Sequence, residues 1–364
     1  MHCAVSKALS IEWLAILAAL GFALGSARSE ASPGYHITHE VSLPGDEGWD
    51  YLAFEQGAHR LFISHGTRVL VVDSDTLKVV GEVADTPGVH GIALAPDLGR
   101  GYISAGRANI IVVFDLKTLA RLQEIKATGE NPDAILYDVA SHRVFSFNGH
   151  GRNVTAVDAT TNTVLGSIAL DAKPEFAVSD GKGHVYVNLE DRHSVAVINP
   201  QLLAVTSVWP LAGCEEPSGL AIDAARGRLF PACANKVMAV VDSSSGKLLG
   251  TAPIGGGVDA AAFDPGTGLA FASCGEGVLT AVRAGKSGRP EVMQTVQTQP
   301  GARTMALDLA THRVFLVTAN FAPAPAATPE HPHPRGAMLT GTFRLLVLEP
   351  QREATTMTSQ GAHP

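Results

Sequence analysis

The chain has 364 residues and a formal net charge of −8, and its composition is 46% hydrophobic and 17% charged. This acidic balance argues against general nucleic-acid binding, which depends on Lys and Arg clustered against phosphate. With 37 Gly and 21 Pro, turns are frequent, which favours many short strands over long helices.

The first predicted element is a signal peptide over residues 1–31. Lys7 precedes an apolar run over residues 13–24, and small residues follow directly. This order of charge, apolar core and small-residue exit is typical of secretory signal peptides, and the run is too short for a stable membrane span. We therefore expect cleavage after Ala27 or Ala31, a periplasmic or secreted protein, and no membrane span in the mature chain.

Beyond the leader, one pattern recurs: an apolar strand that ends in an acidic or equivalent residue, as in "RVLVVDSDT" and "IIVVFDLKT". The end residues of the first six copies lie 42, 43, 41, 43 and 41 residues apart, and the seventh follows after 66. These end residues are Asp73, Asp115, Asp158, Asn199, Asp242, Arg283 and Glu349. Each unit contains four short β-like runs, and seven such units of about 40 residues indicate a β-propeller.

The segment 35–43 is similar to the fourth strand of a unit, yet no first three strands precede it. The last unit, in turn, has only three strands. We therefore expect the N-terminal strand to complete the last blade, which leaves no exposed sheet edge at the closure. The predicted fold is all-β, a single seven-bladed β-propeller of four-stranded blades over residues 32–350. We expect a monomer, with a disordered tail over residues 351–364.

On these repeats the chain resembles the YVTN-repeat propellers and, within them, the YncE-like family of exported seven-bladed proteins, from about Tyr35 to Glu349. The resemblance implies the fold but no single activity, because propellers include lyases, lactonases, electron-transfer subunits and binding modules. One relative in this family is associated with single-stranded DNA binding. That function needs a basic groove with exposed aromatic side chains, and this chain is acidic and only 6% aromatic.

The entrances of the first strands supply the candidate binding residues. In a propeller these strands line the central channel, so aligned positions form a ring on one face. We call this set the funnel ring: Asp50, His90, Asp133, Glu175, Ser218, Asp259 and Arg303. Four converging carboxylates repel one another and would be relieved by Arg303, by protonation or by a cation. Because His90 falls between Asp50 and Asp133, we expect it to gain a proton or to act as a ligand.

A divalent cation is the cofactor that the funnel ring could hold. Calcium suits carboxylate oxygens, whereas a His among carboxylates suits Mn²⁺, Zn²⁺ or Fe²⁺. The candidate metal ligands are Asp50, His90, Asp133 and Glu175. The alternatives are a ring that binds only channel water and a cation with a purely structural role.

Three cysteines follow the leader: Cys214, Cys233 and Cys274. Cys214 lies in the loop that enters the fifth unit and Cys233 ends the second strand of that unit, so both should lie on one face of one blade. We expect a Cys214–Cys233 disulfide, which is permitted in an exported protein and would stiffen this entrance. Cys274 occupies the position of Cys233 one blade further on and is expected to be a free thiol.

The last unit carries a Pro-rich insertion, placed between residues 321 and 340, on the face of the funnel ring. Its composition predicts an extended, semi-rigid segment. His331 and His333 could reach inward as part of a lid, and the alternatives are a solvated spacer or a partner-binding arm. The loops between second and third strands emerge on the same face and offer these polar candidates: His65, Arg107, Asn148, His150, Asn188, Glu190 and Asn235. The alternative is that these residues only form turns, which Asn, Gly and Asp favour for local backbone reasons.

No familiar catalytic motif is present, neither a nucleophile elbow, a P-loop, a zinc-protease helix nor a dinucleotide fingerprint. We therefore predict a binding or scaffold module of the cell envelope that recognises a small molecule, glycan or peptide at the funnel ring. The alternative is a metal-dependent lactonase- or lyase-like enzyme. In that enzyme His90 would move a proton, Arg303 would hold a substrate carboxylate, and the cation ligands would be Asp50, Asp133, Glu175 and Asp259.

Overall fold

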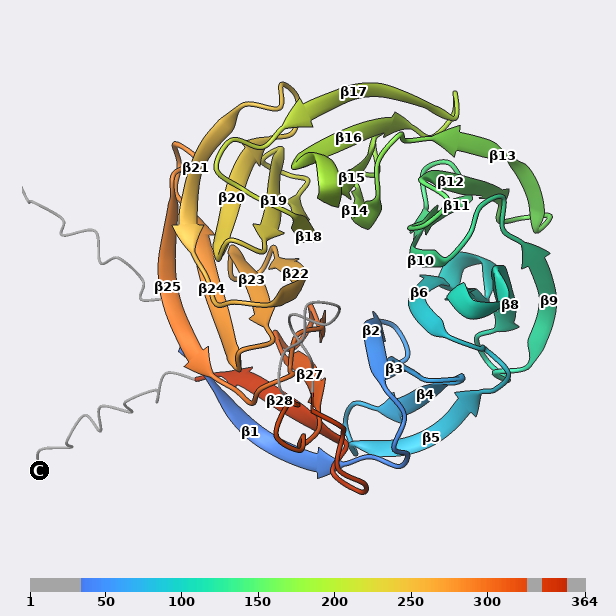
Figure 1. The fold of residues 1–364 in the computed structure, drawn as a ribbon, viewed down its shortest axis with the longest axis vertical. Helices are drawn as coiled ribbons and strands as arrows, with labels where there is room; N and C mark the ends of the chain where they lie inside the picture. Colours follow the sequence, from blue (N-terminus) through green and yellow to red (C-terminus); the bar gives the residue numbers. More distant parts are fainter. Residues whose placement is uncertain (1–33, 326–335, 352–364) are drawn as a thin grey trace, which may run out of the picture. The chain divides into compact units, whose positions relative to one another are not determined.

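The computed structural model describes residues 34–325 and 336–351 and consists of seven four-stranded antiparallel sheets arranged as the blades of a propeller (Figure 1). The first blade comprises β2 (Trp49–Glu55), β3 (Arg60–His65), β4 (Arg68–Asp73) and β5 (Lys78–Val83). The second comprises β6 (Val89–Ala95), β7 (Arg100–Ala105), β8 (Ile110–Asp115) and β9 (Arg121–Lys126). The third comprises β10 (Pro132–Asp138), β11 (Arg143–Asn148), β12 (Asn153–Asp158) and β13 (Thr163–Ala169).

The remaining blades follow the same order. The fourth comprises β14 (Pro174–Ser179), β15 (Val185–Leu189), β16 (Ser194–Asn199) and β17 (Ala204–Pro210). The fifth comprises β18 (Pro217–Asp223), β19 (Arg228–Cys233), β20 (Val237–Asp242) and β21 (Leu248–Pro253). The sixth comprises β22 (Val258–Asp264), β23 (Leu269–Cys274), β24 (Val278–Ala284) and β25 (Pro290–Gln297). The seventh comprises β26 (Met305–Leu307), β27 (Val314–Thr318), β28 (Arg344–Pro350) and β1 (Tyr35–Ser42).

The ring is closed by strands from both ends of the sequence, as the repeat count predicts. β1 pairs antiparallel with β28, with Tyr35 opposite Pro350 and Ser42 opposite Arg344; Figure 1 shows the blue β1 beside the red β28. The first strand of each blade contacts the first strand of the next, and β26 contacts β2. The all-β, seven-bladed fold expected from the sequence is therefore confirmed.

The burial of each strand explains its sequence. The second and third strands, such as β3 and β4, are covered on both faces and are almost continuously apolar. The fourth strands are outer edges, and β17 alternates between exposed and half-buried residues along its length. The core lies between blades, where Phe54 stacks on Phe315 with ring centroids 5.4 Å apart and Phe230 stacks on Phe263 at 5.5 Å.

The recurring acidic residue ends the third strand because it closes the turn that follows. Asp115 accepts hydrogen bonds from the backbone N–H of Lys117 (3.0 Å) and of Thr118 (2.7 Å) and from the Thr118 hydroxyl (2.9 Å). Asn199 accepts equivalent bonds from the backbone N–H groups of Gln201 and Leu202, both 2.9 Å. These side chains stabilise the turn through local hydrogen bonds, which accounts for the Asp or Asn at the end of the third strand in most repeats.

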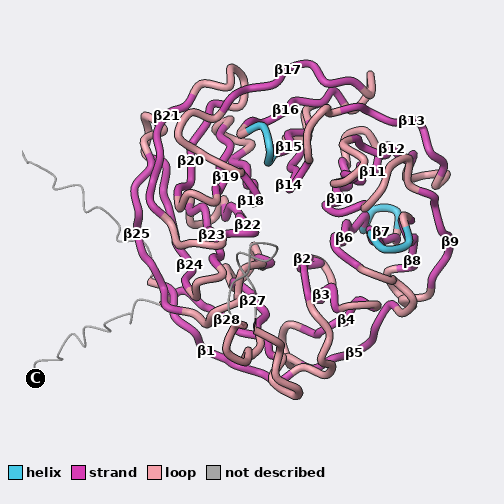
Figure 2. The backbone as a smooth tube through the Cα atoms, viewed as in Figure 1, coloured by secondary structure: helices cyan, strands magenta, loops and turns pink. Residues whose placement is uncertain are grey.

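Helical structure within the described residues is confined to three 3-10 turns, shown in Figure 2 among strands and loops. They are η1 (Pro96–Leu98), η2 (Gly106–Ala108) and η3 (Glu190–Arg192). None of these helices has the length and apolar character that crossing a bilayer requires. The leader expected over residues 1–31, His331, His333 and almost all of the expected tail lie outside the described residues.

Candidate functional site: the funnel ring and its cavity

Each funnel-ring residue of the first six blades lies in a β-bulge. In β2, Trp49 pairs with His65 and Leu52 pairs with Ile63. Two residues of β2, Asp50 and Tyr51, therefore oppose a single residue of β3, Ser64. The first strands of the next five blades shift register at the same place. A bulge redirects a side chain out of the regular alternation. This shared irregularity explains why one position per blade contributes to the funnel ring.

Side chains at the second strands hold the bulged backbones in place. Ser64 Oγ accepts the N–H of Asp50 (2.9 Å), and Ser104 Oγ accepts the N–H of Gly91 (2.8 Å). The Ser104 hydroxyl also donates to the carbonyl of Asp133 in the next blade. Because a bulge leaves backbone groups without a ladder partner, these hydroxyls satisfy groups that burial would otherwise leave unpaired.

Two later blades use the same device. Asn188 Nδ2 donates to the carbonyl of Ser218 (2.9 Å), and Ser273 Oγ donates to the carbonyl of Arg303 (2.5 Å). The backbone of a ring residue is thus fixed from the neighbouring blade. A Ser or Asn next to the end of a second strand is the sequence signal that could have identified these positioning residues.

Opposite charges alternate around the arc from the sixth to the third blade. Arg303 Nε lies 2.7 Å from Asp259 Oδ2, and its Nη2 lies 4.0 Å from Asp50 Oδ1. His90 Nδ1 lies 2.6 Å from Asp50 Oδ2 and 3.8 Å from Asp133 Oδ1. Arg303 therefore lies between Asp259 and Asp50, and His90 between the two aspartates, in the order that the repeat register gives.

Lys173 is a member of the site that the sequence analysis missed. Its Nζ lies 2.7 Å from Glu175 Oε1 and also pairs with Glu190. Lys173 directly precedes Pro174, at the turn that enters β14. One lysine is thus shared by two carboxylates at this blade, and Glu190, a loop candidate, belongs to this cluster.

Aromatic side chains pack immediately beside the ring. Tyr51 follows Asp50 in blade one and Phe176 follows Glu175 in blade four, and their ring centroids are 5.3 Å apart. Tyr51 is only 7% exposed and packs with Ala134 and Ala177 of the third and fourth blades. This contact between distant blades fills the channel next to the carboxylates, which therefore lose part of their hydration.

Burial and repulsion by neighbouring carboxylates raise the pKa values of three ring carboxyls, those of Asp133, Glu175 and Asp259. Burial, with the Asp50 and Asp259 charges, raises the pKa of Asp133 to about 7 against the opposing effect of His90. Burial and the charge of Asp133 raise the pKa of Glu175 to about 8. For His90, burial lowers the pKa, but the hydrogen bond to Asp50 and the charge of Asp133 together raise it by more than burial lowers it. The pKa of His90 is therefore raised overall. The ring therefore favours a protonated His90.

A cavity of about 460 Å³ opens beside Arg303. Its side-chain walls are Trp49, Phe321 and Met338, and glycines form much of the rest. The Arg303 guanidinium lies 5.9 Å from the centroid of the Trp49 ring, and its Nη2 donates to the Trp49 carbonyl (3.2 Å). Arg303 follows from the repeat register, whereas the apolar wall residues do not, because their convergence from three distant segments leaves no linear pattern.

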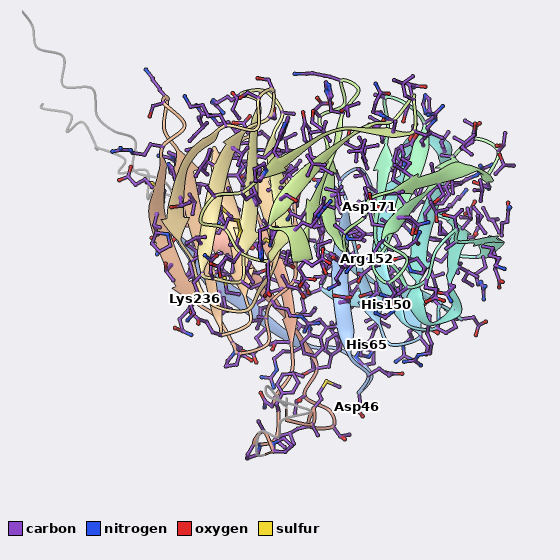
Figure 3. The ribbon with its side chains drawn as sticks, turned by 45° about the horizontal axis from the view of Figure 1, so that its top comes forward. Asp46, His65, His150, Arg152, Asp171 and Lys236 are labelled. Atoms are coloured by element: carbon purple, nitrogen blue, oxygen red, sulfur yellow. A yellow bond between two sulfur atoms is a disulfide. The ribbon has the colours of Figure 1, made fainter. Side chains whose placement is uncertain are left out.

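The base of the Pro-rich insertion supplies two of these walls. Phe321 and Met338 form an antiparallel bridge, flanked by hydrogen bonds from Ala322 N–H to the Ala337 carbonyl and from Leu339 N–H to the Asn320 carbonyl, both 2.8 Å. Figure 3 shows loops of the funnel face, with His65, His150 and Lys236 labelled. The described part of the insertion thus borders the cavity.

Several loop candidates have structural roles instead. His65 is fully buried and stacks on Phe343 with ring centroids 4.4 Å apart. Burial is the main reason that its pKa is lowered, while Glu47, 3.0 Å from Nε2, opposes the shift. Asn148 is buried and donates to Asn153 (2.9 Å). These residues stabilise the loops and do not line the cavity.

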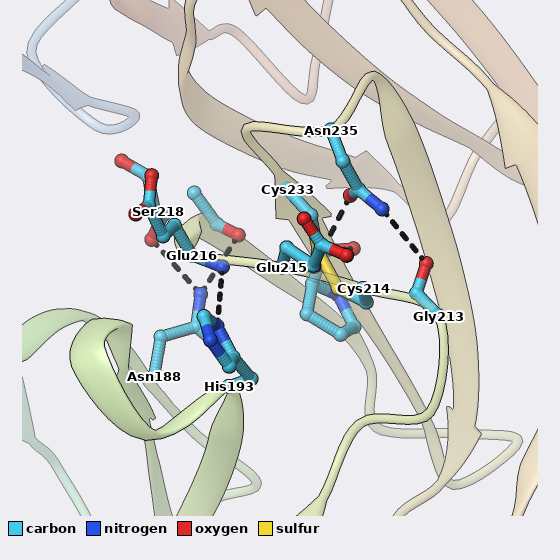
Figure 4. Close-up of a disulfide and its surroundings, with 11 residues drawn as sticks. Asn188, His193, Gly213, Cys214, Glu215, Glu216, Ser218, Cys233 and Asn235 are labelled. Atoms are coloured by element: carbon cyan, nitrogen blue, oxygen red, sulfur yellow. Dashed lines mark hydrogen bonds between the residues drawn. A yellow bond between two sulfur atoms is a disulfide. The ribbon is translucent and has the colours of Figure 1, made fainter.

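The predicted disulfide is present: Cys214 and Cys233 are bonded, with Cα atoms 5.5 Å apart (Figure 4). Hydrogen bonds brace the same loop, from Glu216 N–H to His193 Nδ1 (2.8 Å) and from Glu215 N–H to Asn235 Oδ1 (3.1 Å). Cys274 is a buried free thiol, as expected. Loop stiffening at blade five is therefore covalent as well as hydrogen-bonded.

Comparisons with known proteins identify the fold. No protein-family model matches the chain, and no curated protein matches it. The structure of U3-55K superposes with a TM-score of 0.71 at 9% identity, covering 85% of this chain and 98% of that chain. The RRP9 WD40 repeats give 0.72 at 9% identity, covering 88% and 99%. Hydrazine synthase of Kuenenia stuttgartiensis gives 0.64 at 17% identity, covering 75% and 94%. These likenesses establish the seven-bladed propeller alone.

Proposed function

We propose that this chain is an exported binding module of the YVTN-repeat, YncE-like type, and that its funnel face recognises a small organic ligand. The cavity beside Arg303 is the observation that carries this proposal. Its volume of about 460 Å³ lies within the range of small-molecule sites, which combine apolar walls with a few oriented polar groups. Export is supported by the apolar N-terminal run and by the disulfide.

The arrangement of Arg303 indicates the polar end of the ligand. Its Nε is bonded to Asp259 and one Nη2 hydrogen to the Trp49 carbonyl. A guanidinium has five N–H donors, so donors remain for an acceptor such as a carboxylate or carbonyl. An apolar or aromatic body would then lie against Trp49, Phe321 and Met338.

Trp49 provides the measurement that tests the proposal. In a Trp209→Phe variant of the mature protein, we expect saturable quenching of Trp49 fluorescence by members of a panel of small aromatic and aliphatic carboxylates. Arg303→Met should weaken that binding at least about tenfold, since a charge-assisted bond is lost. The matched control is Arg283→Met, because Arg283 borders a separate cavity of about 310 Å³ with Phe230 and Phe263. No quenching, or equal weakening by both variants, would contradict the proposal.

A metal-dependent lactonase- or lyase-like enzyme is the second candidate. It is favoured by the meeting of Asp50, His90 and Asp133, whose ligand atoms lie within 4.8 Å of one another. Such chemistry needs a cation as Lewis acid. The enzyme hypothesis therefore depends on metal binding at these residues, whereas the binding-module proposal does not.

A further inference from the structure

We infer that Asp50, His90 and Asp133 form a binding site for one divalent transition-metal ion, of the Mn²⁺, Fe²⁺, Co²⁺ or Zn²⁺ class. The three residues come from the first strands of three consecutive blades. This site goes beyond the organic-ligand cavity at Arg303, and binding of the metal does not require that ligand.

The spacing of the donor atoms fits a shared ion. Metal–ligand bonds of about 2.0–2.2 Å place neighbouring donors about 3.0–3.5 Å apart. His90 Nδ1 lies 2.6 Å from Asp50 Oδ2 and 3.8 Å from Asp133 Oδ1, which brackets that spacing. Because the terminal carboxylate torsions are broad, rotation about them can bring both distances toward that spacing.

Charge pairing around the ring leaves these two aspartates without a full counter-charge. Arg303 pairs most closely with Asp259, at 2.7 Å against 4.0 Å to Asp50. Lys173 is shared by Glu175 and Glu190. Asp50 and Asp133 therefore face each other across a single imidazole, and one divalent ion would balance both.

The site is also held in position before any ion binds. Ser64 fixes the N–H of Asp50, and Ser104 fixes the carbonyl of Asp133. The His90 ring lies against Gly106: a Cβ there would be 2.7 Å from His90 Cδ2 and 2.8 Å from Nε2. The absence of a side chain at Gly106 therefore gives the His90 ring room to place Nε2 against the Gly106 backbone, while Nδ1 faces the two carboxylates.

The donor set and the surroundings select the class of metal. One imidazole nitrogen with carboxylate oxygens suits Mn²⁺, Fe²⁺, Co²⁺ and Zn²⁺, whereas Ca²⁺ takes six to eight oxygen ligands. Tyr51, 7% exposed, fills the channel next to the carboxylates. The remaining coordination positions therefore face the funnel, where water or a ligand oxygen can reach the ion.

The test uses the mature protein after treatment with a chelator and removal of that chelator. Calorimetric titration with Mn²⁺ or Zn²⁺ should show one site per chain, and added Mn²⁺ should give the electron paramagnetic resonance signal of a bound ion. His90→Gln and Asp133→Asn should each weaken binding at least about tenfold, since loss of even an outer-shell partner has that effect.

The matched control is His184→Gln. His184 Nδ1 lies 2.8 Å from Asp180 Oδ2, the same kind of pair, but no third ligand residue joins it in the described part of the chain. The inference is overturned if no stoichiometric binding occurs, or if His184→Gln weakens it as much as His90→Gln does. Asp133→Asn keeps the side-chain volume, so it decides the matter even if His90→Gln fails to fold.

Discussion

Aspartate recurs at two regular positions of the repeat, the end of the third strand and the mouth of the first, and the two positions have opposite chemistry. Asp115, at the end of a third strand, is half-buried and accepts three local hydrogen bonds, and these bonds, first of all with Thr118, lower its pKa. Asp133, at the mouth of a first strand, is largely buried beside other carboxylates, and its pKa rises to about 7. The first carboxylate has its acceptors satisfied by its own turn, whereas the second requires protons or cations from elsewhere.

The difference shows how one repeat can supply both structure and a site. The turn aspartates depend only on the next few residues, so each blade can keep one independently. The ring residues depend on what the neighbouring blades place beside them, so they differ from blade to blade: Ser218 donates to Asp259 (3.1 Å), while Glu175 binds Lys173 (2.7 Å).

Removing the aromatic filling beside the ring should have the largest effect. Tyr51→Ala would open the channel and is expected to lower the free energy of unfolding by about 3–5 kcal/mol, because large buried aromatics leave cavities. It should also hydrate Asp133 and bring its pKa closer to that of the turn aspartates. Chemical denaturation measures the first effect and carboxyl-resolved NMR titration the second.

Tyr51→Phe serves as the control, because it keeps the aromatic ring in contact with Phe176. Its free energy of unfolding should stay close to that of the wild type. A Tyr51→Ala protein with unchanged stability would mean that the aromatic contact does not close the channel.

The pH dependence of stability should separate the two kinds of carboxylate. The pKa of Glu175 is raised to about 8 by burial and by Asp133, so the folded state binds a proton that the unfolded state releases above about pH 4.3. Stability should therefore fall as pH rises from about 5 to 8. Melting curves of metal-free protein should show this decline, and Glu175→Gln should flatten it. An equally steep decline in Glu175→Gln would refute the assignment to this group.

Breaking one turn should have the smallest of these effects. Asp115→Ala removes the acceptor of three local hydrogen bonds and should lower the free energy of unfolding only slightly, without changing its pH dependence between pH 5 and 8. Asp75→Ala is the matched control, because Asp75 has only a 3.7 Å contact to His59 and a side chain 62% exposed. The two variants are compared by urea denaturation, and equal stabilities would show that the turn bonds contribute nothing.

The sequence predicted the site unevenly. The seven ring positions follow from the repeat spacing, and the Arg303 and His90 pairings follow from blade order. Lys173 was missed because a lysine before a proline resembles ordinary turn composition. Trp49, Phe321 and Met338 were missed because they approach each other only when the last blade meets the first.

The sequence by itself determined the repeat, the closure by β1 and the disulfide, because each depends on local hydrogen bonding, on alternation or on spacing within one blade. The tertiary structure alone decided which bulged side chains meet, what fills the channel beside them and where the cavity opens. Those outcomes depend on side chains from different blades competing for the same space and for the same counter-charges. Such contacts join residues that are far apart in the sequence and close in space, and for that reason a linear pattern does not contain them.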